Sequence, residues 1–442
     1  MKNKNKLVIS CLWTLVGFSC FIYSDVKSYV AKDDPTYKWK LVSTHEVSDK
    51  MVGYSLELIS QTWQGIEWKH ALRVVLPIEC ETANVILIVG GSRHDNLERI
   101  EKDLDRGREV AEGVMAPVAL LYDVPNQPLF GGLKEDRLLA ETFTRYKNTG
   151  DVNWPIIFPM VKSVVRAMDA LQEFLKEKSD LTQSKFLITG ASKRGWTSWL
   201  SPIVDSRIFG IAPMVYDNLD IPKQMDYQLE SWGDYSKSIA AYTDKDLPQK
   251  LKKGDGPIAK LAKMIDPYTY IRELTVPKLL INGTNDPFWV LDAAKHYIKE
   301  LPGETYLHYA PNAGHGLDKG REAIVSTVAT FFKYLDKRIE MPKVIYDVAS
   351  ASEFSKEKKI VYSSSIEPWE ISLNYAVSDT RDFRKAEWIS LPLLEKRGRY
   401  SKTVSPIKGK YKAYYCQGVY YFDGEELVLS TEIDILKPLI SE

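Results

Sequence analysis

Short apolar segments that alternate with stretches of helical periodicity constrain the fold of this chain more than any other feature. The segments are Val85–Val89, Val118–Leu121, Phe186–Thr189, Ile211–Val215, Lys278–Ile281 and Thr305–Tyr309. Each is four or five residues long and mostly apolar, which predicts strands that are buried on both faces. Buried strands that are connected through helices are typical of a parallel, doubly wound sheet. The sequence therefore predicts an α/β fold.

Helices are predicted between and after these strands. Their ranges are Glu98–Glu112, Pro159–Lys176, a segment from about Arg194, Asp292–Glu300 and Arg321–Leu335. Before the first buried strand, residues 54–63 and 69–76 alternate apolar and polar side chains, which predicts an antiparallel entry into the sheet. The polar and aromatic stretch at about 217–270 interrupts the pattern and is expected to be a lid insertion. The α/β domain is thus predicted over residues 25–340.

The last hundred or so residues follow a different pattern. After Arg338, four segments alternate in the manner of exposed antiparallel strands and are separated by turn-forming runs. These segments are Lys359–Val361, Trp369–Val377, Ala386–Leu393 and Tyr411–Tyr421. We predict a β-rich, sandwich-like C-terminal domain over residues 341–442.

The N-terminus has the features of a targeting segment. Residues 1–6 carry three lysines, and residues 7–23 carry no charge, as in a signal peptide or an uncleaved N-terminal anchor. The residues after Tyr23 do not form a clean cleavage site, and Cys20 lies in a poor lipoprotein motif. We predict export to the periplasm or the medium, with residues 1–24 as the leader and with membrane attachment only if it stays uncleaved.

Charge and ligand spacing exclude several classes of function. Lys and Arg number 59 and Asp and Glu also number 59, so the chain lacks the basic excess of a general nucleic-acid binder. The six histidines show no ligand spacing and no C-x-x-C occurs, which predicts no metal centre. Outside the leader only Cys80 and Cys416 remain, and both a disulfide between them and two free thiols stay open.

Ser192 lies where a catalytic nucleophile is expected. The predicted strand that ends at Thr189 is followed by Gly190-Ala191-Ser192 and by the start of a helix. A strand–turn–helix reversal of this kind is a nucleophile elbow, which holds a serine hydroxyl clear of the backbone. The usual pattern has glycine two residues after the serine, whereas here that position is Arg194 and the glycine is Gly195.

An acid and a base follow Ser192 in the order that this architecture requires. Asp286 comes after the strand at 278–281, and His315 comes after the strand at 305–309. A serine hydroxyl becomes a good nucleophile only when a base takes its proton and an acid orients the base. We therefore predict a triad of Ser192, His315 and Asp286, with Asp217 as an alternative acid after the strand at 211–215.

Backbone N–H groups near Ser192 are candidates for an oxyanion hole. Lys193 begins the helix after the elbow, and Gly91 and Ser92 follow the first buried strand. These are the two places from which this kind of fold directs N–H groups at a developing oxyanion. The alternative for Gly90-Gly91 is that the two glycines merely end a strand.

Four motifs give the chain a family resemblance. They are GASKRGW at 190–196, NGTNDPFW at 282–289, PNAGHG at 311–316 and TRDFR at 380–384. On these motifs the chain resembles the PhoPQ-activated pathogenicity-related family of α/β-hydrolase-like proteins. The family's elbow also carries Lys-Arg-Gly after the serine. The resemblance implies an exported protein with an α/β-hydrolase fold and a β-rich tail, and it names no substrate.

Three other side chains are candidates for contact with a substrate. Arg194, together with Lys193, is expected either to attract an anionic substrate or to pair with structural acids. Trp196 either lines the pocket or packs under the sheet. His94, shortly after Gly91, either contacts a substrate or belongs to a surface loop. The motif at 380–384 is expected to fasten the tail to the main domain through its Arg and Asp residues.

Together these features predict an exported serine hydrolase that cleaves a carboxylic ester or an amide bond through an acyl-enzyme. It needs no cofactor, and its substrate is a small molecule or a peptide. The alternative is a secreted signalling or binding protein that keeps the fold with little or no catalysis. A contact of about 3.5 Å between Ser192 Oγ and a His315 ring nitrogen, with allowance for looser contacts when no substrate is bound, favours the first hypothesis. A wide gap together with a filled cleft favours the second.

Overall fold

The computed structural model describes residues 25–92, 97–179, 181–251, 256–350, 356–396 and 398–439. The predicted leader (1–24) and His94 lie outside these residues. No helix in the described part combines the length and apolar character needed to cross a membrane. The same part of the chain holds no group of His, Cys, Asp and Glu side chains suited to a metal ion.

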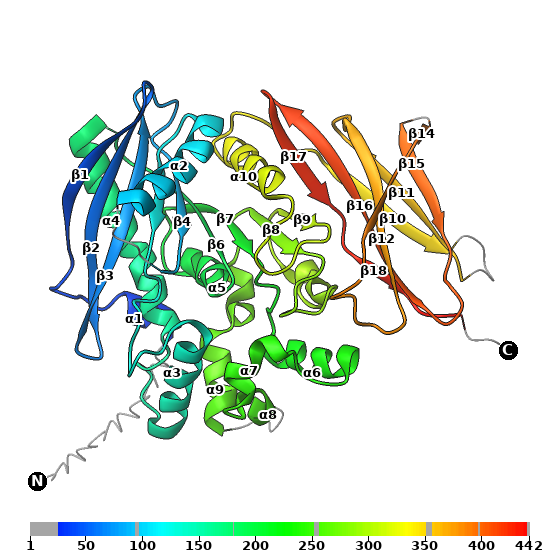
Figure 1. Ribbon diagram of the computed structural model, residues 1–442, viewed down its shortest axis with the longest axis horizontal. Coiled ribbons are helices and arrows are strands. Elements are labelled where there is room, and N and C mark those ends of the chain that lie inside the picture. Colours follow the sequence, from blue (N-terminus) through cyan, green and yellow to red (C-terminus); the bar gives the residue numbers. More distant parts are fainter. Residues whose placement is uncertain are drawn as a thin grey trace, which may run out of the picture.

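A mostly parallel sheet forms the centre of the protein (Figure 1). Six strands run parallel in the order β5-β4-β6-β7-β8-β9. Their bounds are β4 (Val85–Val89), β5 (Val118–Leu121), β6 (Phe186–Ala191), β7 (Ile208–Met214), β8 (Lys278–Gly283) and β9 (Thr305–Ala310). The predicted α/β fold is confirmed, and each predicted buried strand lies in this sheet.

Helices cover both faces of the sheet because its strands are apolar on both sides. Leu87 of β4 shares a core with α4 (Ile157–Ser179) and α5 (Lys193–Leu200), whereas Ile86 shares one with α2 (Leu97–Val114) and α10 (Arg321–Leu335). Three antiparallel strands extend the sheet beyond β5. They are β1 (Lys38–Ser48), β2 (Met51–Trp63) and β3 (Ile66–Pro77), and the short helix α1 (Val26–Val30) precedes them. β1 was not predicted because its polar side chains are mostly solvent-exposed.

The predicted helix at Asp292–Glu300 is wrong. Two short 3₁₀ turns, Ala293–His296 and Ile298–Glu300, take its place. Tyr297 separates them with a φ of −143° and is 1% exposed, and its hydroxyl donates a 2.6 Å hydrogen bond to Asp217. A continuous α-helix is therefore interrupted where this side chain enters the core.

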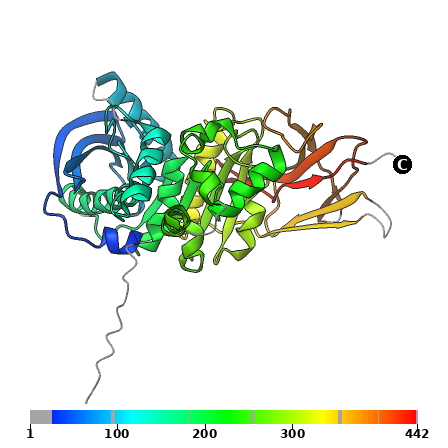
Figure 2. The same ribbon diagram turned by 90° about the horizontal axis from the view of Figure 1, so that it is seen from below.

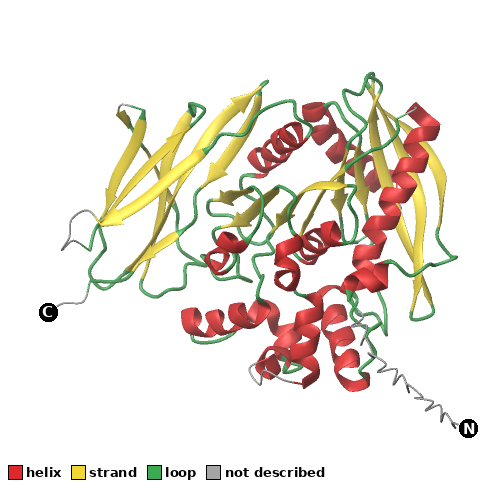
Figure 3. Ribbon diagram, turned by 180° about the vertical axis from the view of Figure 1, so that it is seen from behind, coloured by secondary structure: helices red, strands yellow, loops and turns green. Residues whose placement is uncertain are grey.

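The segment between β7 and β8 is a helical lid. It contains α6 (Ile221–Trp232), α7 (Ala240–Thr243), α8 (Leu247–Leu251) and α9 (Gly256–Ile265). These helices gather on one side of the molecule together with α3 (Glu135–Thr149), and the view from behind shows the same cluster (Figures 1 and 3). These four helices lie between residues 221 and 265.

The C-terminal part consists of two antiparallel sheets that pack face to face (Figure 2). One sheet contains β10 (Val344–Ser350), β11 (Lys358–Ser364), β14 (Glu395–Lys396) and β15 (Arg399–Val404). The other contains β12 (Glu370–Ser378), β13 (Ile389–Pro392), β16 (Tyr411–Phe422), β17 (Glu425–Ser430) and β18 (Asp434–Leu436). Cys416 is buried between them, and both it and Cys80 are free thiols. The predicted sandwich is thus present, and the two cysteines are not paired.

The second tail sheet continues the central sheet, which the sequence did not predict. Ser430 of β17 pairs with Leu307 of β9, and the Tyr309 N–H donates to Ser430 Oγ at 3.0 Å. α10 also holds β17, because the Val428 N–H donates to Thr327 Oγ1 at 3.0 Å. The sandwich is therefore joined to the edge strand that leads into the His315 loop.

Candidate active site

Ser192 lies at a strained turn between β6 and α5. Its φ of 60° and ψ of −123° are unusual for a residue with a side chain, and its N–H donates to Met214 O at 2.9 Å. A Cβ at Gly190 would lie 2.8 Å from Arg194 Cβ, and one at Gly195 would lie 2.7 Å from Met214 O. The turn packs so closely against β7 that position 195 has room only for glycine, which explains why the glycine after Ser192 is Gly195.

Asp286 and His315 meet at the ends of β8 and β9. The His315 Nδ1 atom lies 2.8 Å from Asp286 Oδ2 and 3.0 Å from Oδ1. Asp286 is 6% exposed, and Oδ1 also accepts a 2.8 Å hydrogen bond from the Phe288 N–H. An acid held in this way fixes the ring so that Nε2 is left for a second partner.

The second contact of the predicted triad, between His315 and Ser192, is not made. Within the described residues, His315 Nε2 is buried without a hydrogen-bond partner, and no hydrogen bond joins it to the Ser192 hydroxyl. Phe288 stacks on the His315 ring at 4.0 Å between centroids, and it lines the same pocket as Ser192. The structure therefore forms the acid–base half of the triad and leaves the base–nucleophile half open.

Asp217, the alternative acid, faces a different partner. It accepts hydrogen bonds from the Tyr297 hydroxyl at 2.6 Å and from Asn282 Nδ2 at 3.3 Å. Burial raises the pKa of Asp217 to about 7, and the nearby charge of Asp286 adds to this shift. The structure thus places Asp286, and not Asp217, against His315.

The Gly91 loop packs directly on the elbow. A Cβ at Gly91 would lie 2.6 Å from Arg194 Nη2, so a side chain at this position would displace the Arg194 guanidinium. The Gly91 carbonyl accepts a 2.5 Å hydrogen bond from the Asp123 N–H, which ties the loop after β4 to the loop after β5. The candidate donors Gly91 and Ser92 therefore follow a strand beside β6, and Lys193 is the first residue of α5.

The charges of Lys193 and Arg194 are paired with acids of α3. Arg194 makes a two-pronged contact with the Glu135 carboxylate at 2.7 and 2.8 Å, and its Nε donates to Val124 O at 2.5 Å. Lys193 Nζ lies 2.9 Å from Glu135 Oε2 and 3.3 Å from Asp136 Oδ1. Of the two hypotheses for Arg194, the structure supports pairing with structural acids.

Glu135 is a residue that the sequence analysis missed. Burial would raise the pKa of its carboxyl, but the hydrogen bonds and charges of Arg194 and Lys193 outweigh burial and hold the pKa well below its usual range. Glu135 begins α3 with a φ of 52°, and Lys134 offers no capping side chain. The sequence therefore carried no recognisable helix start at this point.

A mostly apolar pocket opens beside Ser192. Trp196 lines it, stacks on Tyr216 at 5.1 Å and donates from its ring nitrogen to Ile265 O at 2.7 Å. The lid and the residues around it supply most of the wall, which consists of Phe143, Tyr216, Ile221, Met225, Ile239, Tyr242, Leu247, Pro248, Leu251, Ile258, Leu261, Ala262, Ile265, Phe288 and Trp289. The remaining lining residues are Asp136, Ser192, Lys193, Trp196 and Asn218.

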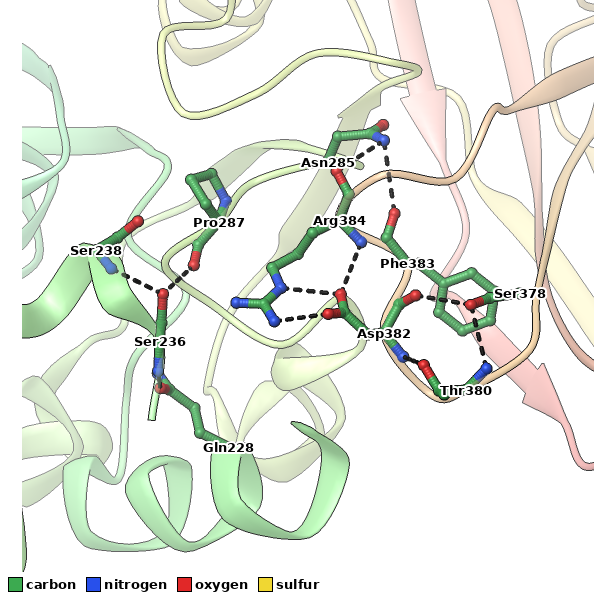
Figure 4. A network of polar contacts seen from close by, with 10 residues as sticks. All are labelled: Gln228, Ser236, Ser238, Asn285, Pro287, Ser378, Thr380, Asp382, Phe383 and Arg384. Atoms are coloured by element: carbon green, nitrogen blue, oxygen red, sulfur yellow. Dashed lines mark hydrogen bonds and ion pairs between the residues drawn. The ribbon is translucent and has the colours of Figure 1, made fainter. Parts of the chain in front are cut away.

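A loop of the tail supports the segments that carry the acid and the base. Asn285, the residue before Asp286, donates from Nδ2 to Ala386 O at 2.7 Å. The same Nδ2 donates to Arg384 O at 3.3 Å (Figure 4). Asn312 exchanges two hydrogen bonds with the Trp388 backbone, at 3.0 and 2.8 Å. The tail thus contacts both loops of the acid–base pair.

The motif at 380–384 has a divided role. Arg381 reaches Asp292 Oδ2 of the main domain at 2.7 Å and also contacts the Tyr227 hydroxyl. Asp382 instead pairs with Arg384 at 2.6 Å within the loop (Figure 4). The arginine therefore fastens the tail to the main domain as predicted, whereas the aspartate shapes the loop itself.

Sequence comparison matches most of the described chain. The family model described as PhoPQ-activated pathogenicity-related protein matches residues 26–384. A protein named autocrine proliferation repressor protein A, from Dictyostelium discoideum, is 32% identical over 400 residues, which cover 86% of this chain and 79% of that protein.

Solved structures with a similar arrangement are distant in sequence. Acetyl xylan esterase 1 from Thermoanaerobacterium sp. is 13% identical over 70% of this chain and 92% of its own, with a TM-score of 0.48. Pyrococcus horikoshii acylaminoacyl peptidase is 15% identical over 69% of this chain and 51% of its own, with a TM-score of 0.40. The fold assignment rests on the strand order described above.

Proposed function

The chain belongs to the PhoPQ-activated pathogenicity-related family, and from this premise we propose that it is a serine hydrolase of carboxylic ester or amide bonds, with esters preferred. The observation that carries the proposal is the 2.8 Å contact between Asp286 and His315. This pair lies on the same edge of the sheet as the strained elbow of Ser192. A serine, a histidine and an acid in this order are the parts that acyl transfer requires.

In the proposed reaction, Ser192 Oγ attacks the substrate carbonyl while His315 Nε2 takes its proton. Asp286 stabilises the resulting imidazolium through Nδ1. The N–H of Lys193 and that of Gly91 or Ser92 donate to the oxyanion. His315 then protonates the leaving group, and a water molecule releases the acyl group from Ser192 by the reverse sequence. The hydrogen bond between Ser192 Oγ and His315 Nε2 forms when the substrate binds, because catalytic contacts often tighten only in the complex.

Export completes the proposal. The basic residues 1–6 and the uncharged residues 7–23 are typical of a secretory leader. A substrate outside the cytoplasm, a small molecule or a peptide, is the corresponding expectation. No nucleic-acid partner and no cofactor are part of the proposal.

A second candidate function is a secreted signalling or binding protein. The observation that favours it is the missing hydrogen bond between Ser192 and His315 in the described residues. The Dictyostelium relative, named as a repressor of proliferation, is consistent with such a role. In that case the pocket beside Ser192 would hold a ligand without cleaving it.

Labelling with a fluorophosphonate probe tests the hydrolase proposal, because the probe reacts with an activated serine. We expect the wild type to be labelled, Ser192→Ala to be unlabelled and its ester turnover to fall by on the order of 10⁶-fold. Ser206→Ala, a change at an exposed serine, is the matched control and should keep full labelling. Equal labelling of Ser192→Ala and the wild type contradicts the proposal. A wild type that is neither labelled nor active favours the binding protein.

A further inference from the structure

The pocket beside Ser192 has a composition that selects a chemical class of ligand. Its wall is apolar apart from a few positions near the elbow. Among the described residues, the charged lining groups are Lys193 and Asp136, which lie 3.3 Å apart and neutralise each other, and Lys193 is also paired with Glu135. A charged group would lose its hydration along this apolar wall, and the polar lining groups that could partner it, Ser192, Tyr216 and Asn218, lie near the elbow.

The position of His315 decides which half of an ester would enter this pocket. The leaving group must meet His315 Nε2 to receive a proton. Ser192 lines the pocket, but His315 does not, and Phe288 covers the ring face of His315 while lining the pocket. The pocket therefore extends from Ser192 away from the leaving group, on the side of the acyl chain.

The lid sets the far limit of the pocket. α8 and α9 carry lining residues but none of the predicted triad, and their contributions are aliphatic. Nearer the elbow the wall is aromatic, with Trp196, Tyr216 and Trp289 among its members. The pocket therefore changes from an aromatic wall near Ser192 to an aliphatic wall at the lid.

We propose that the substrate is an ester whose acyl group is an uncharged hydrocarbon chain of medium length, and that this chain lies in the pocket against α8 and α9. This inference rests on the proposed hydrolase function for the cleavage step, but binding of the chain does not require cleavage. Each additional buried methylene is then expected to raise kcat/KM about fourfold until the pocket is full.

Two tryptophan substitutions on α9 test the position of the chain. Ala262 lines the pocket and is 5% exposed, whereas Ala259 lies on the same helix, is half-buried and does not line it. The substrates are p-nitrophenyl esters from acetate to dodecanoate. We expect Ala262→Trp to move the preferred ester to a shorter chain and Ala259→Trp to leave it unchanged. Ile258→Ala, which removes part of the wall, should move the preference to a longer chain and serves if Ala262→Trp fails to fold.

Binding separates the failure of this inference from the failure of the proposed function. Calorimetry with decanoate on the Ser192→Ala protein needs no turnover, and acetate is the short-chain control. We expect decanoate to bind, and we expect Ala262→Trp added to Ser192→Ala to weaken it at least tenfold. Chain-dependent binding without any ester turnover in the wild type would overturn the hydrolase and keep the pocket assignment. Equal kcat/KM for all chain lengths, or decanoate binding unaffected by Ala262→Trp, would overturn the pocket assignment.

Discussion

Asp217 provides a test of how a buried carboxyl affects the pH dependence of stability, because its surroundings disfavour the charged form. It is 3% exposed, and burial raises its pKa from 3.8 to about 7. The folded protein therefore keeps a proton on this carboxyl between pH 4 and 7, whereas the unfolded chain releases it. Stability is consequently lost as pH rises through this window. A shift of about three pKa units corresponds to a loss of up to about 4 kcal/mol.

Asp217→Asn removes this dependence. The amide oxygen still accepts the hydrogen bond that the Tyr297 hydroxyl donates at 2.6 Å, and the side chain no longer ionises. We expect the free energy of unfolding of the variant, relative to that of the wild type, to increase by up to about 4 kcal/mol between pH 4 and pH 8. Most of this increase should occur below pH 7.

Urea unfolding followed by tryptophan fluorescence at several pH values measures the effect. The comparison between variant and wild type cancels the contribution of Asp266, whose pKa burial also raises to about 7. Asp244→Asn, at an exposed lid position, is the control and should show a constant difference. A difference for Asp217→Asn that also stays constant from pH 4 to 8 would refute the reasoning.

Enzyme turnover of the same variant tests which aspartate acts as the acid of the triad. Asp286 holds His315, so Asp217→Asn should keep most of the activity, whereas Asp286→Asn should lower kcat by about 10⁴-fold. Equal losses in the two variants would contradict the assignment of the acid.

Two further substitutions test the packing around the site. Gly91→Ala places a methyl group 2.6 Å from Arg194 Nη2. We expect this change to lower the free energy of unfolding by about 1–3 kcal/mol and to reduce kcat. An unchanged urea midpoint would contradict the packing role of Gly91. Asn312→Ala removes two hydrogen bonds to the Trp388 backbone and should cost about 1–3 kcal/mol in urea unfolding. An unaltered midpoint for that variant would show that the tail does not support the His315 loop.

Much of the fold could be predicted from local sequence patterns. The buried strands could be predicted because each one is a short apolar run. Asp286 and His315, which the structure brings into contact, could be proposed together with Ser192 because each of the three follows such a strand. The helix at Asp292–Glu300 could not be judged in this way. Its apolar spacing is helical, but the burial of Tyr297 interrupts it, and burial depends on contacts far away in the sequence.

The rest of the site depends on pairings that a sequence does not record. Glu135 lies 59 residues from Arg194, and α3 has no cap that marks its start. The join between β17 and β9 brings together residues more than a hundred positions apart. The stacking of Phe288 on the His315 ring is also a contact that no residue pattern specifies.

The pairing of β17 with β9 gives the tail a structural role in the central sheet. An open strand edge invites association with other chains, and in this protein the tail covers the edge that β9 would otherwise present. The histidine loop begins where that covered strand ends. The C-terminal sandwich is therefore an extension of the central sheet, and the residues that support the histidine loop extend well beyond residue 340.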